Sequence, residues 1–234
     1  MHKVKQIHTF FKWLKLEHIK NASTQETYQE LAKNSNYDNI IDYARRSKDL
    51  EKLTNNLDIP GKKVLDLACG TGAFITAFLK QNPKEVVGVD ITAGMLAVAK
   101  DRFKNNTNVS LINSSFMDVE FEDNSFDFVV MANASRYIPV GQEDIFFTNV
   151  KKWLKDDGIF LIHADFWGGN LGKSIEPILL HFTNETHVNP ATTFSGNLEK
   201  ELLKHFKIYK RDSLQGSMAL GIRHSVFFCK KTSA

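Results

Sequence analysis

The stretch KVLDLACGTGAF, residues 63–74, joins a short apolar run to a turn of small residues and then to further apolar residues. The first run is rich in Val and Leu, which is typical of a strand buried on both faces of a parallel sheet. The apolar residues after the turn have the spacing of one face of a helix. The stretch therefore predicts a strand, a glycine turn and a helix in succession.

The same alternation continues along the chain. Further apolar runs of strand length occupy residues 85–90, 108–113, 125–133, 158–166, 207–214 and 223–231. Helical patterns separate them at residues 93–103, 142–155 and 195–206. Strands that alternate with helices indicate an α/β fold. We predict a Rossmann-like, doubly wound, mainly parallel sheet of seven strands with an antiparallel terminal strand.

Two segments lie outside this alternation. Residues 1–55 are helical in pattern and are predicted to form an N-terminal cap or lid. Residues 56–234 then form the sheet domain, in which residues 166–194 are a long insert after the fifth strand. Long irregular segments in compact domains are often functional lids, so the insert is expected on the substrate side.

Composition limits the class of protein. The 234 residues are 42% hydrophobic and 24% charged, which suits one globular core. No apolar run has the roughly 20 residues of a membrane span, and residues 1–20 lack the pattern of a signal peptide, which favours a cytoplasmic protein. Two cysteines, Cys69 and Cys229, are too few for a disulfide framework or a cysteine zinc site. The net charge of +3 does not indicate nucleic-acid binding.

The glycine turn does not match a dinucleotide site. That motif has a third glycine three positions after the second, whereas Ile75 follows Gly72 at this spacing. Asp66 adds a negative charge where a pyrophosphate would need backbone donors. Gly70 and Gly72 still allow a ligand to approach the backbone closely. A cationic or zwitterionic ligand fits this turn better than an anion.

A second acid extends the argument. Asp90 ends the second strand, where a carboxylate can accept hydrogen bonds from both hydroxyls of a ribose. Asp66 can accept a hydrogen bond from an ammonium group. A ligand with an amine and a ribose but no phosphate points toward S-adenosylmethionine.

Three motifs in order resemble the class I S-adenosylmethionine-dependent methyltransferases. They are VLDLACGTG (64–72), VVGVD with ITAGMLAVAK (86–100) and FEDNSFDFVV (121–130). The resemblance covers roughly residues 37–165 and is strongest to the small-molecule branch. It implies a Rossmann-like methyltransferase domain, S-adenosylmethionine as cofactor and S-adenosylhomocysteine as product.

The resemblance also implies which residues contact the cofactor. The methionine half would lie against Tyr43, Asp66, Ala68, Gly70 and Gly72, with Asn133 near the sulfonium. The ribose would be held by Asp90, and the adenine by Ile91, Met95, Ser115 and Phe116. Ser115 stands where the family often has an acid that holds the adenine edge, and Asp118 is an alternative for that task.

Methyl transfer requires orientation, desolvation and sometimes the removal of one proton. Tyr137 falls where small-molecule members frequently have a histidine that faces the substrate, so it is a candidate catalytic residue. His163, at the end of the fifth strand, is a candidate general base. Each is alternatively a structural residue. No metal site is predicted, and no NPPY-type motif for methylation of planar nitrogens follows the fourth strand.

The sequence predicts methyl transfer to an oxygen or nitrogen of a small metabolite, by a monomer or homodimer. Val4, Ile7, Phe11 and Leu14 share one helical face that lysines surround. Such a helix suits a lid, or alternatively a membrane surface and a quinone or lipid-precursor acceptor. A third reading is a regulatory protein that binds the cofactor without catalysis.

Overall fold

The computed structural model describes residues 24–33, 36–41, 43–167, 192, 195–215 and 222–232. Its strands are β1 (Lys63–Leu67), β2 (Glu85–Asp90), β3 (Val109–Asn113), β4 (Phe126–Ala132), β5 (Leu154–Trp167), β6 (Phe206–Gln215) and β7 (Ile222–Lys231). Its helices are α2 (Thr24–Ala32), α3 (Asn36–Ile41), α4 (Tyr43–Thr54), α5 (Ala73–Leu79), α6 (Ala93–Arg102), α7 (Glu143–Trp153) and α10 (Ser195–His205), with a short 3-10 helix η3 (Ser135–Tyr137).

The strands form one sheet in the order β3-β2-β1-β4-β5-β7-β6. Neighbouring strands from β3 to β5 are parallel, whereas β7 runs antiparallel to both β5 and β6. The predicted Rossmann-like sheet of seven strands, with its antiparallel terminal strand, is confirmed. Its order reverses at β1 and β4, where doubly wound sheets bind ligands outside the carboxyl ends of the strands.

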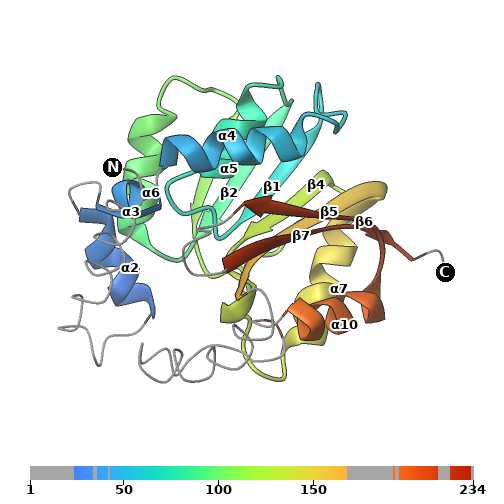
Figure 1. Cartoon of the computed structure of the whole chain (residues 1–234). Helices are drawn as coiled ribbons and strands as arrows, with labels where there is room; N and C mark the ends of the chain where they lie inside the picture. The colour runs from blue at the N-terminus through green and yellow to red at the C-terminus, as the bar shows by residue number, and fades with distance from the viewer. Residues whose placement is uncertain are drawn as a thin grey trace.

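Helices cover both faces of the sheet (Figure 1). On one face α4, α5 and α6 pack on alternate strand residues such as Val64 and Val130. On the other face α7 and α10 pack on Leu65, Leu67 and Met131. The near-continuous apolar strands are thus buried on both sides, as parallel strands require.

Helices α2, α3 and α4 come from the segment expected to be a cap. The side chain of Gln29 on α2 accepts a hydrogen bond from the Gly94 N–H at the start of α6, 2.9 Å away. Gln25 donates to the Ile91 carbonyl oxygen at 3.1 Å, and Met95 is buried in a small cluster on the same helix pair. Helix α2 therefore docks on α6 beside the carboxyl end of β2. The cap boundary at residue 55 stays a prediction.

Parts of the predicted organisation lie outside the described residues. These are the basic N-terminal helix within residues 1–23 and most of the insert, residues 168–191. Within the ranges that the structure describes, no helix is long and apolar enough to cross a membrane. Those ranges also contain no group of three or more metal-binding side chains.

Candidate functional site

The turn after β1 follows a backbone path that favours glycine. Ala68, Gly70 and Gly72 all have positive φ, at 56°, 55° and 90°. A Cβ atom at Gly72 would lie only 2.3 Å from a ring atom of the buried Phe103. The sequence folds locally in this way because Gly72 tolerates both the left-handed conformation and the close contact. Ala68 adopts the same conformation with a Cβ atom, which is a strained state typical of functional sites.

The Asp90 carboxylate ties this turn to the end of β2. Its Oδ2 accepts a hydrogen bond from the Gly70 N–H at 2.8 Å, and its Oδ1 accepts one from the Thr92 N–H at 2.8 Å. Burial raises the pKa of Asp90, and the bonds from Thr92 and Gly70 oppose that rise. Each carboxylate oxygen can still accept a further hydrogen bond, so the pair of oxygens suits a diol.

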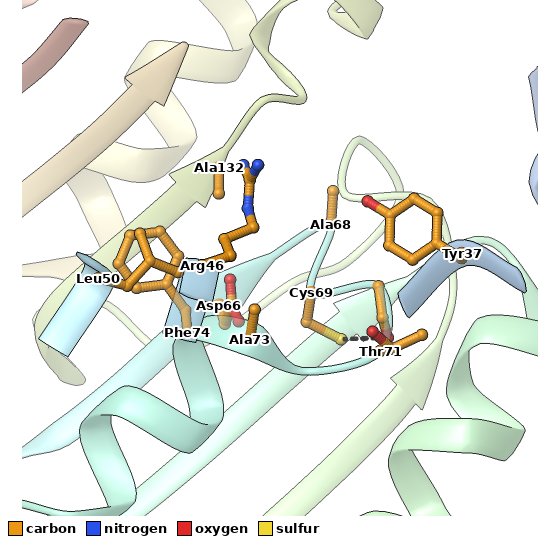
Figure 2. Close-up of a pocket in the computed structure, with 11 residues that line it drawn as sticks. Tyr37, Arg46, Leu50, Asp66, Ala68, Cys69, Thr71, Ala73, Phe74 and Ala132 are labelled. Atoms are coloured by element: carbon orange, nitrogen blue, oxygen red, sulfur yellow. Dashed lines mark hydrogen bonds between the residues drawn. The ribbon is translucent and has the colours of Figure 1, made fainter. Parts of the chain in front are cut away.

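A cavity opens between the turn and helices α3 and α4 (Figure 2). It is lined by Tyr37, Arg46, Leu50, Asp66, Ala68, Cys69, Gly70, Thr71, Ala73, Phe74 and Ala132. Figure 2 shows the Arg46 side chain extending from α4 past Asp66 toward Ala132, with Tyr37 on the other side of the turn. One cavity therefore brings together a carboxylate, a guanidinium and a glycine turn.

Both charged groups of the cavity are costly to bury. Asp66 is 2% exposed, and its burial together with the nearby Asp90 raises its pKa well above the ordinary carboxyl value. Burial lowers the pKa of Arg46, although the neighbouring phenols of Tyr37 and Tyr28 oppose the change. A ligand with an ammonium and a carboxylate would compensate both groups, because buried charges are stabilised by paired partners.

Tyr43, the tyrosine predicted to contact the methionine half, contacts the end of the turn and the start of α5. Its hydroxyl donates to the Gly72 carbonyl oxygen at 2.9 Å and lies 2.7 Å from Thr76 Oγ1. From α3 and α4, the residues that line the cavity are Tyr37, Arg46 and Leu50, and not Tyr43. Sequence reasoning missed Arg46. The available signal was its place one helical turn after Tyr43 in the segment YARRS.

The predicted adenine residues lie along the edge that follows β2. Ile91 is 45% exposed, whereas Met95 is 2% exposed and packs under helix α2. Asn113, which sequence reasoning missed, donates through Nδ2 to the carbonyl oxygens of Asp90 at 2.9 Å and Ile91 at 3.0 Å. This amide fixes the backbone of Asp90 and Ile91, the residues predicted to contact the ribose and the adenine.

Ser115 and Phe116 follow β3. The Ser115 hydroxyl accepts a hydrogen bond from the Met117 N–H at 3.1 Å. The Phe116 ring packs edge-on against Phe146, with ring centroids 5.5 Å apart. The Ser115 side chain thus stabilises its own turn, and the role of these residues toward adenine stays a prediction.

The end of β4 places Asn133 beside His163. Asn133 has a φ of 53°, and its N–H donates to the His163 carbonyl oxygen at 2.6 Å. Among the described residues the buried Oδ1 of Asn133 has no hydrogen-bond partner, which is unusual for a buried polar atom. The His163 side chain is 1% exposed and is not part of the cavity lining.

Tyr137 belongs to η3, directly after β4. Its hydroxyl lies 3.1 Å from the hydroxyl of Tyr28 on α2. The Tyr28 ring also packs edge-on against Tyr37, with centroids 5.9 Å apart. Three phenols from three elements therefore meet beside the cavity, of which sequence reasoning singled out only Tyr137 as catalytic.

The sequence of this chain resembles known proteins over its central part, from β1 to the start of β5. Residues 64–158 match a family model described as a methyltransferase domain. The chain is 33% identical over 128 residues to a demethylmenaquinone methyltransferase of Staphylococcus carnosus, which covers 51% of this chain and 53% of that protein. A demethylmenaquinone methyltransferase of Staphylococcus aureus is 34% identical over 104 residues, which are 43% of each chain. The chain thus matches only about half the length of these curated relatives.

Solved structures share the fold over a longer range. The PH0226 protein of Pyrococcus horikoshii superposes with a TM-score of 0.66 at 21% identity, over 86% of this chain and 93% of that chain. A putative S-adenosylmethionine-dependent methyltransferase of Listeria monocytogenes gives a TM-score of 0.62 at 20% identity, over 81% and 99%. Geranyl diphosphate C-methyltransferase of Streptomyces coelicolor was crystallised with S-adenosylhomocysteine. It superposes with a TM-score of 0.63 at 15% identity, over 80% of this chain and 78% of that chain.

Proposed function

We propose that this chain is a methyltransferase that uses S-adenosylmethionine to methylate a small-molecule acceptor, as the match of residues 64–158 to a methyltransferase domain and the shared fold support. The observation that supports this most directly is the cavity at the glycine turn. It holds Asp66 and Arg46 together, and Asp90 stands at the next strand end. These are the partners that an ammonium, a carboxylate and a ribose diol need.

Each group has a defined task in this proposal. Asp66 accepts from the ammonium of the methionine half, and Arg46 pairs with its carboxylate. Asp90 accepts from the ribose hydroxyls. When bound, the cofactor supplies a methyl group that is already activated on a sulfonium. The remaining tasks of the chain are to orient the acceptor and to exclude water.

Calorimetric titration with S-adenosylhomocysteine tests the cofactor site. We expect binding to the unmodified chain, and at least about tenfold weaker binding after Arg46→Gln or Asp66→Asn, because each change leaves one ligand charge unpaired. Arg45→Gln, at an exposed position next to Arg46, is the matched control and should bind as the unmodified chain does. Tighter binding of NAD than of S-adenosylhomocysteine would refute the assignment.

The proposed acceptor is a small molecule that is methylated on oxygen or nitrogen. A second candidate is a quinone-type ring methylated on carbon, which the names of the Staphylococcus relatives favour. The aromatic rings of Tyr28, Tyr37 and Tyr137 beside the cavity suit a flat apolar acceptor. Transfer of a labelled methyl group to reduced demethylmenaquinone, compared with transfer to an extract of polar metabolites, distinguishes the two candidates.

Tyr137 is the proposed catalytic residue, because it is half-buried beside α2 and can orient an acceptor. His163 was the second candidate, as a general base, but we propose a structural role for it, since its side chain is 1% exposed and does not line the cavity. The absence of labelled product with every acceptor, despite binding of S-adenosylhomocysteine, would instead support a regulatory protein. Cosedimentation with anionic liposomes tests whether the full chain associates with a membrane. A cytoplasmic location and a monomeric or dimeric state stay predictions.

A further inference from the structure

We propose that Arg102 is a positioning residue for the glycine turn after β1, called the cofactor turn from here on. We also propose that its ion pair with Asp38 couples docking of the cap helices α2, α3 and α4 to cofactor binding. This inference rests on the proposed function. Arg102 is the last residue of α6, and Asp38 belongs to α3. Neither residue belongs to the cavity lining, so the role proposed for Arg102 is indirect.

The Arg102 guanidinium contacts three separate elements. Its Nη1 donates to the Thr71 carbonyl oxygen in the glycine turn. Its Nη2 donates to the Asp38 carboxylate on α3. Its Cζ lies 3.8 Å from the centroid of the Tyr43 ring on α4. A planar guanidinium can make directed hydrogen bonds and stack on an aromatic ring at the same time, which a lysine cannot do.

Thr71 is held from two sides by this arrangement. Its hydroxyl donates to Asp38 Oδ1 at 2.6 Å, and its carbonyl oxygen accepts from Arg102. Thr71 is also one of the residues that line the cavity, directly after Gly70. The Asp38–Arg102 pair therefore fixes the backbone of the turn at the place where it meets the ligand.

The same ion pair fixes the cap. Tyr37, adjacent to Asp38 on α3, lines the cavity opposite Arg46. When Asp38 is paired with Arg102, Tyr37 is held over the turn. The Asp38 and Arg102 side chains are 15% and 25% exposed, so solvent screens the pair less than it screens an ion pair at the open surface. Cap docking and formation of the cofactor turn share one interaction, and ligand binding must favour both.

The alternative role of Arg102 is to stabilise the end of helix α6, because a positive side chain in the last turn of a helix interacts favourably with the helix dipole. A double-mutant cycle separates the two roles. We expect Arg102→Gln and Asp38→Asn each to weaken S-adenosylhomocysteine binding about tenfold and to speed its dissociation. The double variant should bind no more weakly than either single variant. A helix-end role predicts instead that the effects of the two single substitutions add in the double variant, because Asp38 would then act on the turn only through Thr71.

The exposed pair Lys104–Asp101 supplies the matched control, because it lies at the same helix end, 3.1 Å apart, away from the turn. Lys104→Gln and Asp101→Asn should leave binding and dissociation unchanged. Added guanidinium ion should partly restore affinity to an Arg102→Ala variant, which a role confined to helix stability would not produce. Circular dichroism of each variant identifies loss of folding, and Asp38→Asn tests the coupling if Arg102 variants unfold.

Two failures are distinguishable. If the unmodified chain does not bind S-adenosylhomocysteine, the proposed function is wrong. If it binds and both Asp38→Asn and Arg102→Gln bind equally well, the coupling is wrong and the proposed function stands.

Discussion

The phenol oxygens of Tyr28 and Tyr137 lie 3.1 Å apart, although 109 positions separate the two residues in sequence. Their rings meet edge to face, with centroids 6.2 Å apart and planes at 86°. The contact joins cap helix α2 to the segment after β4. When one phenol donates to the other, the second still has a hydrogen to donate to an acceptor.

Replacing Tyr137 by Phe should lower methyl transfer without weakening the binding of S-adenosylhomocysteine. The hydroxyl would orient the acceptor, so we expect a loss of about 10- to 100-fold in kcat/KM for the active acceptor. Tyr28→Phe should have a smaller effect of the same kind, since it removes only the partner of Tyr137. Unchanged kcat/KM in both variants would remove Tyr137 from the site.

His163→Asn should affect stability more than chemistry. The imidazole is 1% exposed on β5, so its replacement by a smaller polar group leaves space in a packed interior and should cost about 1–3 kcal/mol of unfolding free energy. We expect kcat, corrected for the folded fraction, to fall less than in Tyr137→Phe. A loss of more than about 100-fold in kcat with unchanged stability would identify His163 as the general base.

Affinity for S-adenosylhomocysteine should rise with pH in the acid range. Burial and Asp90 raise the pKa of Asp66 in the unliganded fold, whereas a bound ammonium favours its ionised form. Binding therefore releases a proton until the pH exceeds the raised pKa. The thermal stabilisation by the ligand should be larger at about pH 8 than at about pH 5.

The folding stability of the unliganded protein should fall as pH rises, and the same Asp66 carboxyl group is the cause. Because the folded pKa of Asp66 exceeds its unfolded value, the folded state binds the proton more tightly, and this contribution is lost as pH rises through the folded pKa. Asp66→Asn should flatten both pH profiles in part. Burial also raises the pKa of Asp90, so Asp90 contributes a pH dependence of the same sign, which the Asp66→Asn variant should retain.

Gly72→Ala should destabilise the fold far more than Gly61→Ala. Both residues have positive φ, at 90° and 73°, so both substitutions impose left-handed strain of about 1–2 kcal/mol. Only at Gly72 does the added Cβ meet the Phe103 ring, whereas nothing lies within 4 Å at Gly61. Chemical denaturation should give a difference of about 1–3 kcal/mol between the two variants. Equal losses would contradict this close packing.

The sheet could be predicted from sequence because its strands are short apolar runs separated by clear helical patterns. Val64, Leu65 and Leu67 illustrate this, since burial on both faces leaves a nearly continuous hydrophobic stretch. The last two strands were predicted from the apolar runs at residues 207–214 and 223–231, with one antiparallel terminal strand. The docking of α2 on α6 was not predicted, because it depends on polar contacts from Gln25 and Gln29 that no periodicity reveals.

The glycine turn was predicted because Asp66, Gly70 and Gly72 occur within one local motif, and Asp90 ends the next strand in sequence. Arg46 was missed as a lining residue, since it comes from a helix whose placement over the turn is a tertiary property. The contact of Tyr43 with the cofactor stays a prediction, and its hydroxyl bonds to the Gly72 carbonyl oxygen and lies within hydrogen-bond distance of Thr76 Oγ1.

The cavity at the glycine turn has a consequence for how such an enzyme would respond to its own product. Asp66, Arg46 and Asp90 would contact the amino-acid and ribose groups, which are identical in the methyl donor and in the demethylated product. These hydrogen bonds therefore discriminate little between donor and product, and the region near Asn133 and Tyr137 would sense the missing methyl most directly. The product should compete strongly, so that the rate follows the ratio of donor to product in the cell rather than the amount of donor alone.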